Sequence, residues 1–185
     1  MICQINLGVM MALMGVVALN SSAAAEAGNQ AKKQGQLDCA VEDNGAPGSG
    51  TMVLMRAGND VIQTSCGKPM SVNPGKYKVS LRLDGALDRP EKTMQAVVGA
   101  GTTRVLRAKF ETGVLECHAT VQGRRAAALA IISQDGQRVG SLGMGVTGKL
   151  SSGTYEVTIR HRNEEKVFNA VKVTQSERRV LDAAF

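Results

Sequence analysis

The residues of this 185-residue chain best suited to chemistry are its cysteines and histidines. Three cysteines, Cys39, Cys66 and Cys117, follow an uncharged N-terminal stretch. A disulfide between Cys39 and Cys66 would close a loop of about 27 residues and stabilise the fold by roughly 3–4 kcal/mol in the chain-entropy model. Two alternatives stay open: a bond between Cys39 and Cys117, or three reduced thiols, because a free cysteine also packs well as a small apolar residue.

His118 and His161 are the two histidines, and their surroundings in the sequence do not form a metal or catalytic motif. Zinc needs three or four converging ligands, and the chain has no C-x-x-C or H-x-x-x-H spacing. There is also no G-x-S-x-G nucleophile motif. Asp84 and Asp88 fall in an expected hairpin loop, where charge is normally solvated. We therefore expect no catalytic residue, no metal and no cofactor.

The sequence contains an internal repeat, and this repeat defines the structural elements on which the cysteines and histidines lie. At an offset of 78 residues, and without a gap, the second copy repeats the first-copy residues Leu37, Cys39, Gly45, Gly58, Val61, Gly67, Gly75, Tyr77, Val79 and Arg82. The second copy is then three residues shorter, and the offset falls to 75 up to Phe185. The repeat predicts two domains, residues 37–110 and 115–185, joined by a linker at 111–114.

Alternating side chains predict that both copies are built from strands. Tyr77, Val79 and Leu81 alternate with polar residues after a Pro-Gly turn, a period of two that indicates a strand with one buried face. Other short runs at a spacing of about ten residues, with Gly-rich turns, raise the count to about seven strands per copy. The apolar run 125–132 competes as a helix, but its first-copy counterpart is strand-like. The fold class is therefore all-β, with two tandem antiparallel β-sandwich domains.

The N-terminus has the pattern of an export signal. Residues 1–25 carry no charged side chain, and the apolar run 7–19 is followed by small residues that allow cleavage after Ala25. No Lys or Arg precedes the run, so an uncleaved anchor, a buried helix and a start upstream of Met1 stay open. Residues 26–36 are expected to be a flexible leader. The predicted location is periplasmic or secreted.

The net charge of +6 belongs to the part of the chain that follows the signal segment. The basic residues are dispersed and are not interleaved with aromatic residues, which disfavours a nucleic-acid partner. A weak attraction to an acidic membrane surface is possible on charge grounds alone. The second copy is richer in arginine, and its predicted partner-binding residues are Arg124, Arg125, Arg160 and Arg162.

The order of short strands, the Gly-x-Tyr-x-Val motif and two closing strands resembles bacterial immunoglobulin-like and prealbumin-like sandwich repeats. Gly75, Tyr77 and Val79 carry this resemblance, as do their second-copy counterparts. Repeats of this kind occur as carboxypeptidase-regulatory-like and PEGA-type domains and beside von Willebrand factor A domains. The resemblance implies a non-catalytic binding, spacer or assembly module, and it transfers no functional residue.

Together these observations predict an exported, non-catalytic binding or scaffold protein of the bacterial cell envelope that belongs to a protein assembly. A structural ring or stalk subunit of an envelope machine and a hydrolase with an unrecognised site are the alternatives. The sequence leaves the oligomeric state and the identity of the partner open.

Overall fold

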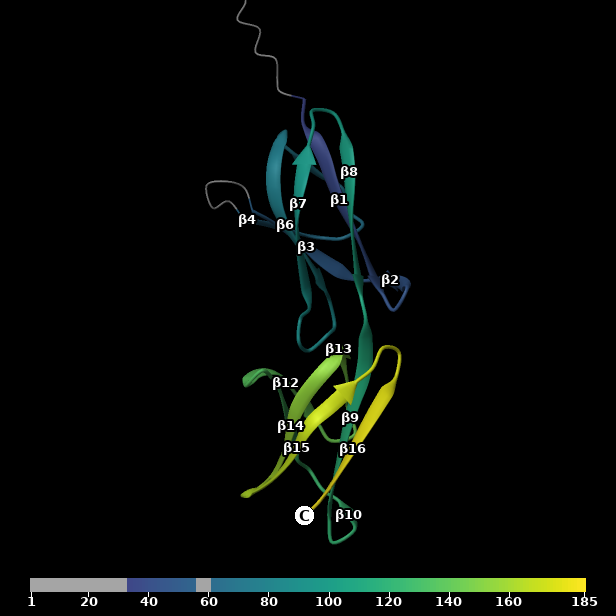
Figure 1. The fold of residues 1–185 in the computed structure, drawn as a ribbon, viewed down its shortest axis with the longest axis vertical. Coiled ribbons are helices and arrows are strands. Elements are labelled where there is room, and N and C mark those ends of the chain that lie inside the picture. Colours follow the sequence, from purple (N-terminus) through teal and green to yellow (C-terminus); the bar gives the residue numbers. More distant parts are fainter. Residues whose placement is uncertain (1–32, 56–60) are drawn as a thin grey trace, which may run out of the picture. The chain divides into compact units, whose positions relative to one another are not determined.

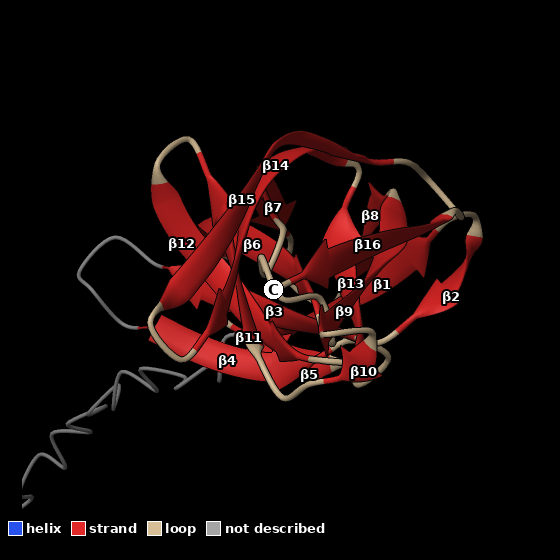
Figure 2. Cartoon of the chain, turned by 90° about the horizontal axis from the view of Figure 1, so that it is seen from below, coloured by secondary structure: helices blue, strands red, loops and turns tan. Residues whose placement is uncertain are grey.

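The computed structural model describes residues 33–55 and 61–185, and every regular element in these ranges is a β-strand (Figure 2). The all-β class expected from the alternating pattern is therefore confirmed. The signal segment at 1–25 and residues 26–32 of the expected leader lie outside the described residues. Within the described ranges, no helix is long and apolar enough to cross a membrane.

The first copy forms two four-stranded sheets that enclose one core (Figure 1). Its strands are β1 (Gly35–Asp43), β2 (Ala46–Gly48), β3 (Gly50–Met55), β4 (Val61–Ser65), β5 (Met70–Val72), β6 (Gly75–Leu83), β7 (Glu91–Val98) and β8 (Thr103–Phe110). In one sheet β1 is central, with β2 and β5 along one edge and β8 along the other. The other sheet has the order β4-β3-β6-β7.

The second copy repeats this arrangement strand for strand. Its strands are β9 (Thr112–Val121), β10 (Arg124–Arg125), β11 (Leu129–Gln134), β12 (Gln137–Gly143), β13 (Thr147–Ser151), β14 (Gly153–His161), β15 (Glu164–Val173) and β16 (Arg178–Ala184). Here β9 is central between β16 on one edge and β10 and β13 on the other, and the second sheet has the order β12-β11-β14-β15. Each copy thus has eight strands rather than about seven, because a short strand forms after the first turn.

The first and last strands of each copy pair in parallel, which the expectation of a purely antiparallel sandwich did not include. Cys39 of β1 lies opposite Leu106 of β8, and Cys117 of β9 lies opposite Leu181 of β16. Consecutive strands joined by a hairpin must run antiparallel. The strands β7 and β8 belong to different sheets, so no hairpin fixes the direction of β8, and it joins β1 in parallel.

The hairpin turn at Asn44-Gly45 shows why the repeat keeps its register. Both residues have positive φ, 54° and 82°, as the two-residue turn of type I′ requires. The second copy repeats the turn with Gln122 and Gly123, at 50° and 76°. Glycine adopts this conformation without strain, so the identity at Gly45 and Gly123 has a backbone cause.

Two separate cores lie between the sheets, one in each copy, and aliphatic side chains dominate both. The predicted inward rows are confirmed, because Tyr77 and Tyr155 are 6% and 2% exposed. Each tyrosine hydroxyl donates to a carbonyl four residues upstream, Asn73 at 2.5 Å and Ser151 at 2.9 Å. This bond ties the start of the strand to the preceding turn, as in the tyrosine corner of immunoglobulin-like sandwiches.

Three expected boundaries differ from the structure. Gly35 and Gln36 belong to β1 rather than to a flexible leader, because they pair with β5. The expected linker at 111–114 shrinks to Glu111, since β9 begins at Thr112 and pairs there with Ser151. Within the run 125–132, the expected strand begins only at Leu129, and it is buried on one face alone, because Ala130 and Ile132 are buried while Leu129 is exposed.

Candidate functional site

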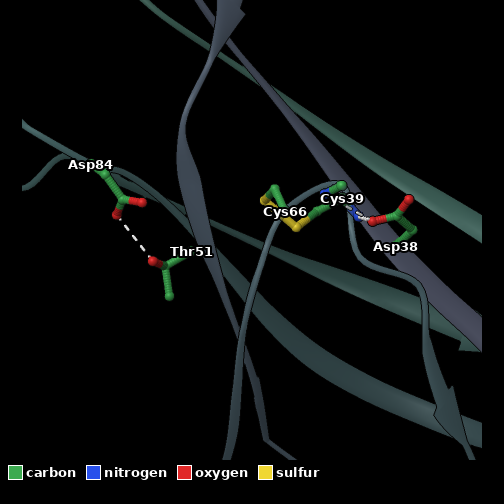
Figure 3. The surroundings of a disulfide bond; sticks show 6 residues. Asp38, Cys39, Thr51, Cys66 and Asp84 are labelled. Atoms are coloured by element: carbon green, nitrogen blue, oxygen red, sulfur yellow. Dashed lines mark hydrogen bonds between the residues drawn. A yellow bond between two sulfur atoms is a disulfide. The ribbon is translucent and has the colours of Figure 1, made fainter.

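The disulfide predicted between Cys39 and Cys66 is present, with the two Cα atoms 4.7 Å apart (Figure 3). Cys39 lies on β1 of one sheet, and Cys66 directly follows β4, the edge strand of the other sheet, so the bond ties the segment after β4 to β1. The Gly67 N–H beside it donates to the Cys39 carbonyl at 2.9 Å and to Asp38 Oδ1 at 3.1 Å. The disulfide therefore closes the loop after β4 against β1.

The second copy keeps the geometry of this corner without the bond. Cys117 is the counterpart of Cys39, and the Gly145 N–H donates to the Cys117 carbonyl at 2.8 Å. Met144 stands at the place of Cys66 and packs against the second core. Cys117 is a free thiol with no exposed surface, and burial raises its pKa to about 11. The thiol is therefore protonated at neutral pH and is not a nucleophile.

The two histidines lie in different surroundings, and each has a local partner. His118 Nε2 lies 3.0 Å from Glu116 Oε1, and the Arg178 guanidinium contacts the other oxygen of that carboxylate. Glu116 is only 5% exposed. His161 Nδ1 lies 2.8 Å from the Ala127 carbonyl. Among the described residues, no group of three His, Cys, Asp or Glu side chains could hold a metal ion.

The predicted partner-binding arginines lie on two hairpins of the second copy. Arg124 and Arg125 form β10, and both are exposed. Arg162 follows β14 in the turn to β15. A hollow of about 520 Å³ separates the two hairpins, and its lining residues are Val121, Ala126, Ala127, His161 and Arg162. We call this region the basic end of the second copy.

Arg160 differs from the other three arginines. Its Nε lies 2.7 Å from Glu165 Oε1, so a carboxylate on the neighbouring strand compensates its charge. Among the ion pairs of the described residues, Arg124, Arg125 and Arg162 have no such partner. The free positive charge of the basic end therefore comes from these three side chains.

Sequence reasoning missed the loop that contacts the second copy, residues 84–90 between β6 and β7. Asp88, expected in solvent, accepts hydrogen bonds through Oδ2 from the Ser151 N–H at 3.1 Å and the Tyr155 hydroxyl at 3.0 Å. The Leu87 N–H donates to the Lys149 carbonyl at 2.9 Å, and the Leu87 side chain packs against the second core. The loop is thus a structural contact between the two copies.

The turn after β1 adds a polar contact between the copies. Asp43 Oδ2 lies 2.6 Å from Lys149 Nζ, and Asp43 Oδ1 accepts the Thr112 hydroxyl hydrogen at 2.7 Å. The Asn44 amide donates to the Thr112 carbonyl and accepts from the Thr112 N–H, both at 2.9 Å. Asp43 and Asn44 carry no motif, which is why the sequence did not single them out.

Comparison with known proteins found no family model and no curated protein that matches this chain. Among solved structures it is similar to the Bacillus anthracis TIE protein, with 16% identity and a TM-score of 0.33, over 82% of this chain and 34% of that one. A putative adhesin from Bacteroides ovatus has 10% identity and a TM-score of 0.41, over 82% of this chain and 87% of the adhesin.

A fimbrial protein from Bacteroides ovatus has 8% identity and a TM-score of 0.30, and the match covers 82% of this chain and 49% of the fimbrial protein. The chain thus spans about a third of the TIE protein and about half of the fimbrial protein. At these values of identity and TM-score, the three proteins assign no function to this chain.

Proposed function

We propose that this protein is an exported, non-catalytic binding module of the bacterial cell envelope, and that the basic end of the second copy contacts an acidic protein partner. The observation that carries the proposal is that Arg162 lines the hollow while Arg124 and Arg125 lie in the chain between its lining residues Val121 and Ala126, and that none of the three forms an ion pair among the described residues. Guanidinium groups form two parallel hydrogen bonds to a carboxylate, so three of them favour an acidic surface.

The hollow also offers apolar surface beside these positive charges. Val121, Ala126 and Ala127 line it beside Arg162, so a partner could place a small apolar group there while its carboxylates meet the arginines. His161 turns one ring nitrogen toward the Ala127 carbonyl, which fixes the orientation of its ring. Interfaces that combine a small apolar centre with a charged rim are common among protein assemblies.

The Cys39–Cys66 disulfide supports the proposed location outside the cytosol. Disulfides persist in oxidising compartments and are rare where thiols are kept reduced. The expected signal segment at 1–25 agrees with this location, although it lies outside the described residues. A periplasmic protein and a secreted protein would share both features.

Charge reversal tests the proposal. The variant with Arg124→Glu and Arg125→Glu is compared with a matched control, Lys76→Glu and Lys78→Glu on β6 of the first copy. Each protein is expressed in the native host with an affinity tag, and co-purified envelope proteins are quantified by mass spectrometry at low and high salt. We expect the arginine variant to lose a partner that the lysine variant retains, with the larger difference at low salt. Equal losses in both variants, or none in either, would refute the basic end as the binding surface.

A further inference from the structure

A second hollow of the second copy lies between the edge strands of its two sheets. Its volume is about 320 Å³, and its lining residues are Ala170, Lys172, Thr174, Glu177, Arg178 and Arg179. These residues belong to β15, to β16 and to the turn that joins the two strands. The turn lies against the start of β9, where the Ser176 N–H donates to the Thr112 carbonyl, whereas the basic end lies where β9 ends, at Val121. We call this hollow the β15–β16 cleft.

The free positive charge of the cleft comes from Lys172 and Arg179. Among the ion pairs of the described residues, neither side chain has a carboxylate partner. Arg178 differs, because its guanidinium contacts the buried carboxylate of Glu116 and is held there. Two uncompensated positive charges match a phosphate monoester, which carries a charge between about −1.5 and −2 at neutral pH. Arginine meets phosphate oxygens with two parallel hydrogen bonds, and lysine meets them as a point charge.

One wall of the cleft, the turn 174–177, is held firmly against β9. The Val114 N–H donates to the Glu177 carbonyl at 2.8 Å. Gly113 beside it leaves no room for a side chain, because a Cβ there would collide with the Thr174 carbonyl oxygen. A wall that is already ordered lowers the entropic cost of binding a ligand.

A β-bulge in β15 disfavours a peptide strand as the occupant of the cleft. The pairing of β14 with β15 shifts register between Tyr155 and Val157, so β15 carries one extra residue at this point. Ala170 lies in the bulge with a φ of 54°, and it lines the cleft. Bulges break the regular spacing of N–H and C=O groups along a sheet edge and so oppose the addition of another strand. The cleft therefore suits a small molecule better than an extended peptide.

The size and the rim of the cleft indicate what the phosphate is attached to. A phosphate ion alone fills only a small part of about 320 Å³. The exposed Glu177 carboxylate repels a bare anion, but it accepts hydrogen bonds from hydroxyl groups, and the Thr174 hydroxyl both donates and accepts them. A phosphate attached to a ring of hydroxyl groups satisfies both the basic and the acidic side chains.

The first copy has the same turn without the same charge. Its turn 99–102 packs against Gly35, where a Cβ would lie 2.5 Å from the Gly99 carbonyl oxygen. At the repeat offset of 75, Val97 stands in place of Lys172. The basic pair is thus a feature of the second copy, and the first copy provides a control within the same protein.

We propose that the β15–β16 cleft binds a sugar phosphate. Lys172 and Arg179 hold the phosphate monoester, and Glu177 and Thr174 bind hydroxyl groups of the sugar. This site goes beyond the proposed function at the basic end. The two surfaces share no residue and are tested with different probes, so a failure of one proposal leaves the other standing.

A titration followed by NMR tests the proposal. Glucose 6-phosphate is added at neutral pH to the isotopically labelled full chain, and amide chemical shifts are recorded. We expect saturable shifts at Lys172, Thr174 and Arg179. The first-copy counterparts Val97 and Arg104 should not shift, because the lysine is absent there.

Substitutions of exposed side chains assign the phosphate to its two basic residues. Lys172→Val gives the cleft the residue of the first copy, and Arg179→Gln removes the guanidinium. Each should weaken the affinity for glucose 6-phosphate about fivefold, the upper range for an exposed ion pair. The matched control is Arg104→Gln, the same change at the first-copy counterpart of Arg179, and it should leave the affinity unchanged.

Glu177→Ala separates a sugar phosphate site from a general anion site. The change removes an acceptor for sugar hydroxyl groups, so the affinity for glucose 6-phosphate should fall. It also removes a negative charge from the rim, so the affinity for inorganic phosphate should rise. A site that responds to charge alone would bind both probes more tightly after this substitution, and that result would contradict the proposal.

Three further results would overturn the proposal. The first is an absence of saturable shifts in the cleft at millimolar glucose 6-phosphate. The second is an equal affinity for glucose 6-phosphate and inorganic phosphate in the parent protein. The third is binding to phosphatidylglycerol vesicles that is lost in Lys172→Val, combined with no response to glucose 6-phosphate. That result would identify a membrane surface as the ligand of the cleft.

Discussion

Asp88 Oδ2 lies 3.0 Å from the hydroxyl oxygen of Tyr155, and this contact joins a loop of the first copy to the core of the second. The same hydroxyl lies 2.9 Å from the Ser151 carbonyl, so one hydrogen is shared between two acceptors. Asp88 Oδ1 is buried and has no partner among the described residues. Burial and the nearby Asp88 carboxylate raise the pKa of the Tyr155 hydroxyl, which keeps it protonated as a donor.

Removal of the Asp88 carboxylate should destabilise the protein. Asp88→Ala leaves the Ser151 N–H without its acceptor, and we expect a loss of about 1–3 kcal/mol in the free energy of unfolding. The matched control is Asp84→Ala in the same loop. This change removes an exposed hydrogen bond, in which the Thr51 hydroxyl donates to Asp84 Oδ1 at 3.0 Å (Figure 3), and it should lower the free energy of unfolding clearly less. Urea denaturation measures both. Equal costs at the two positions would mean that the contact with Tyr155 adds nothing.

The buried thiol predicts a stability loss at high pH. Burial raises the pKa of Cys117 to about 11, whereas the unfolded chain ionises its thiol near the ordinary value, 9.0. The folded state therefore binds the thiol proton more tightly than the unfolded state does. The stabilisation that results is complete below about pH 9 and falls as the pH rises toward 11. The expected slope is up to about 1.4 kcal/mol per pH unit.

Other groups also titrate in this range, so the comparison with Cys117→Ala isolates the thiol. The difference in unfolding free energy between the parent and the variant should shrink from pH 8.5 to pH 11. A constant difference over that range would show that the thiol ionises equally in the folded and unfolded states.

The repeat predicts that a second disulfide can be built into the second copy. Met144→Cys places a thiol opposite Cys117 at the same separation in sequence as Cys39 and Cys66, in a corner with the same backbone bond from Gly145. We expect a bond that forms on air oxidation and stabilises by about 3 kcal/mol. Non-reducing mass spectrometry and urea denaturation with and without reductant measure it. Cys66→Ala, which removes the natural bond, should lose a similar amount under oxidising conditions.

Failure of the new bond would have a clear meaning. If Met144→Cys stayed reduced while Cys39–Cys66 formed in the same protein, the corners of the two copies would differ in geometry despite their shared sequence register.

The fold could be predicted from the sequence where local rules decide it. Alternation at Tyr77, Val79 and Leu81 set the buried face, and the identity of Gly45 and Gly123 marked the turns, because both features depend on residues close together in the chain. The parallel pairing of Cys39 with Leu106 depends on contacts between residues far apart in sequence, and no local pattern encodes it.

The contact at Asp88 was missed for a different reason. The loop 84–90 lies where the two copies differ in length, so the repeat gave no counterpart to compare, and a carboxylate in a hairpin loop is usually solvated. The three additional residues of the first copy were the available signal. The structure shows that they lie in the segment that carries Leu87 and Asp88 onto the second copy.

Site-specific photocrosslinking in the native host tests the central claim, that the basic end of the second copy is a partner-binding surface. A photoreactive residue replaces Gln122, exposed in the hairpin turn beside Arg124 and Arg125, and in a control it replaces Lys76 of the first copy. We predict a discrete crosslinked adduct from position 122, absent from position 76 and lost when Arg124→Glu and Arg125→Glu are added. No adduct from position 122, or an adduct that persists after both charge reversals, would contradict the claim.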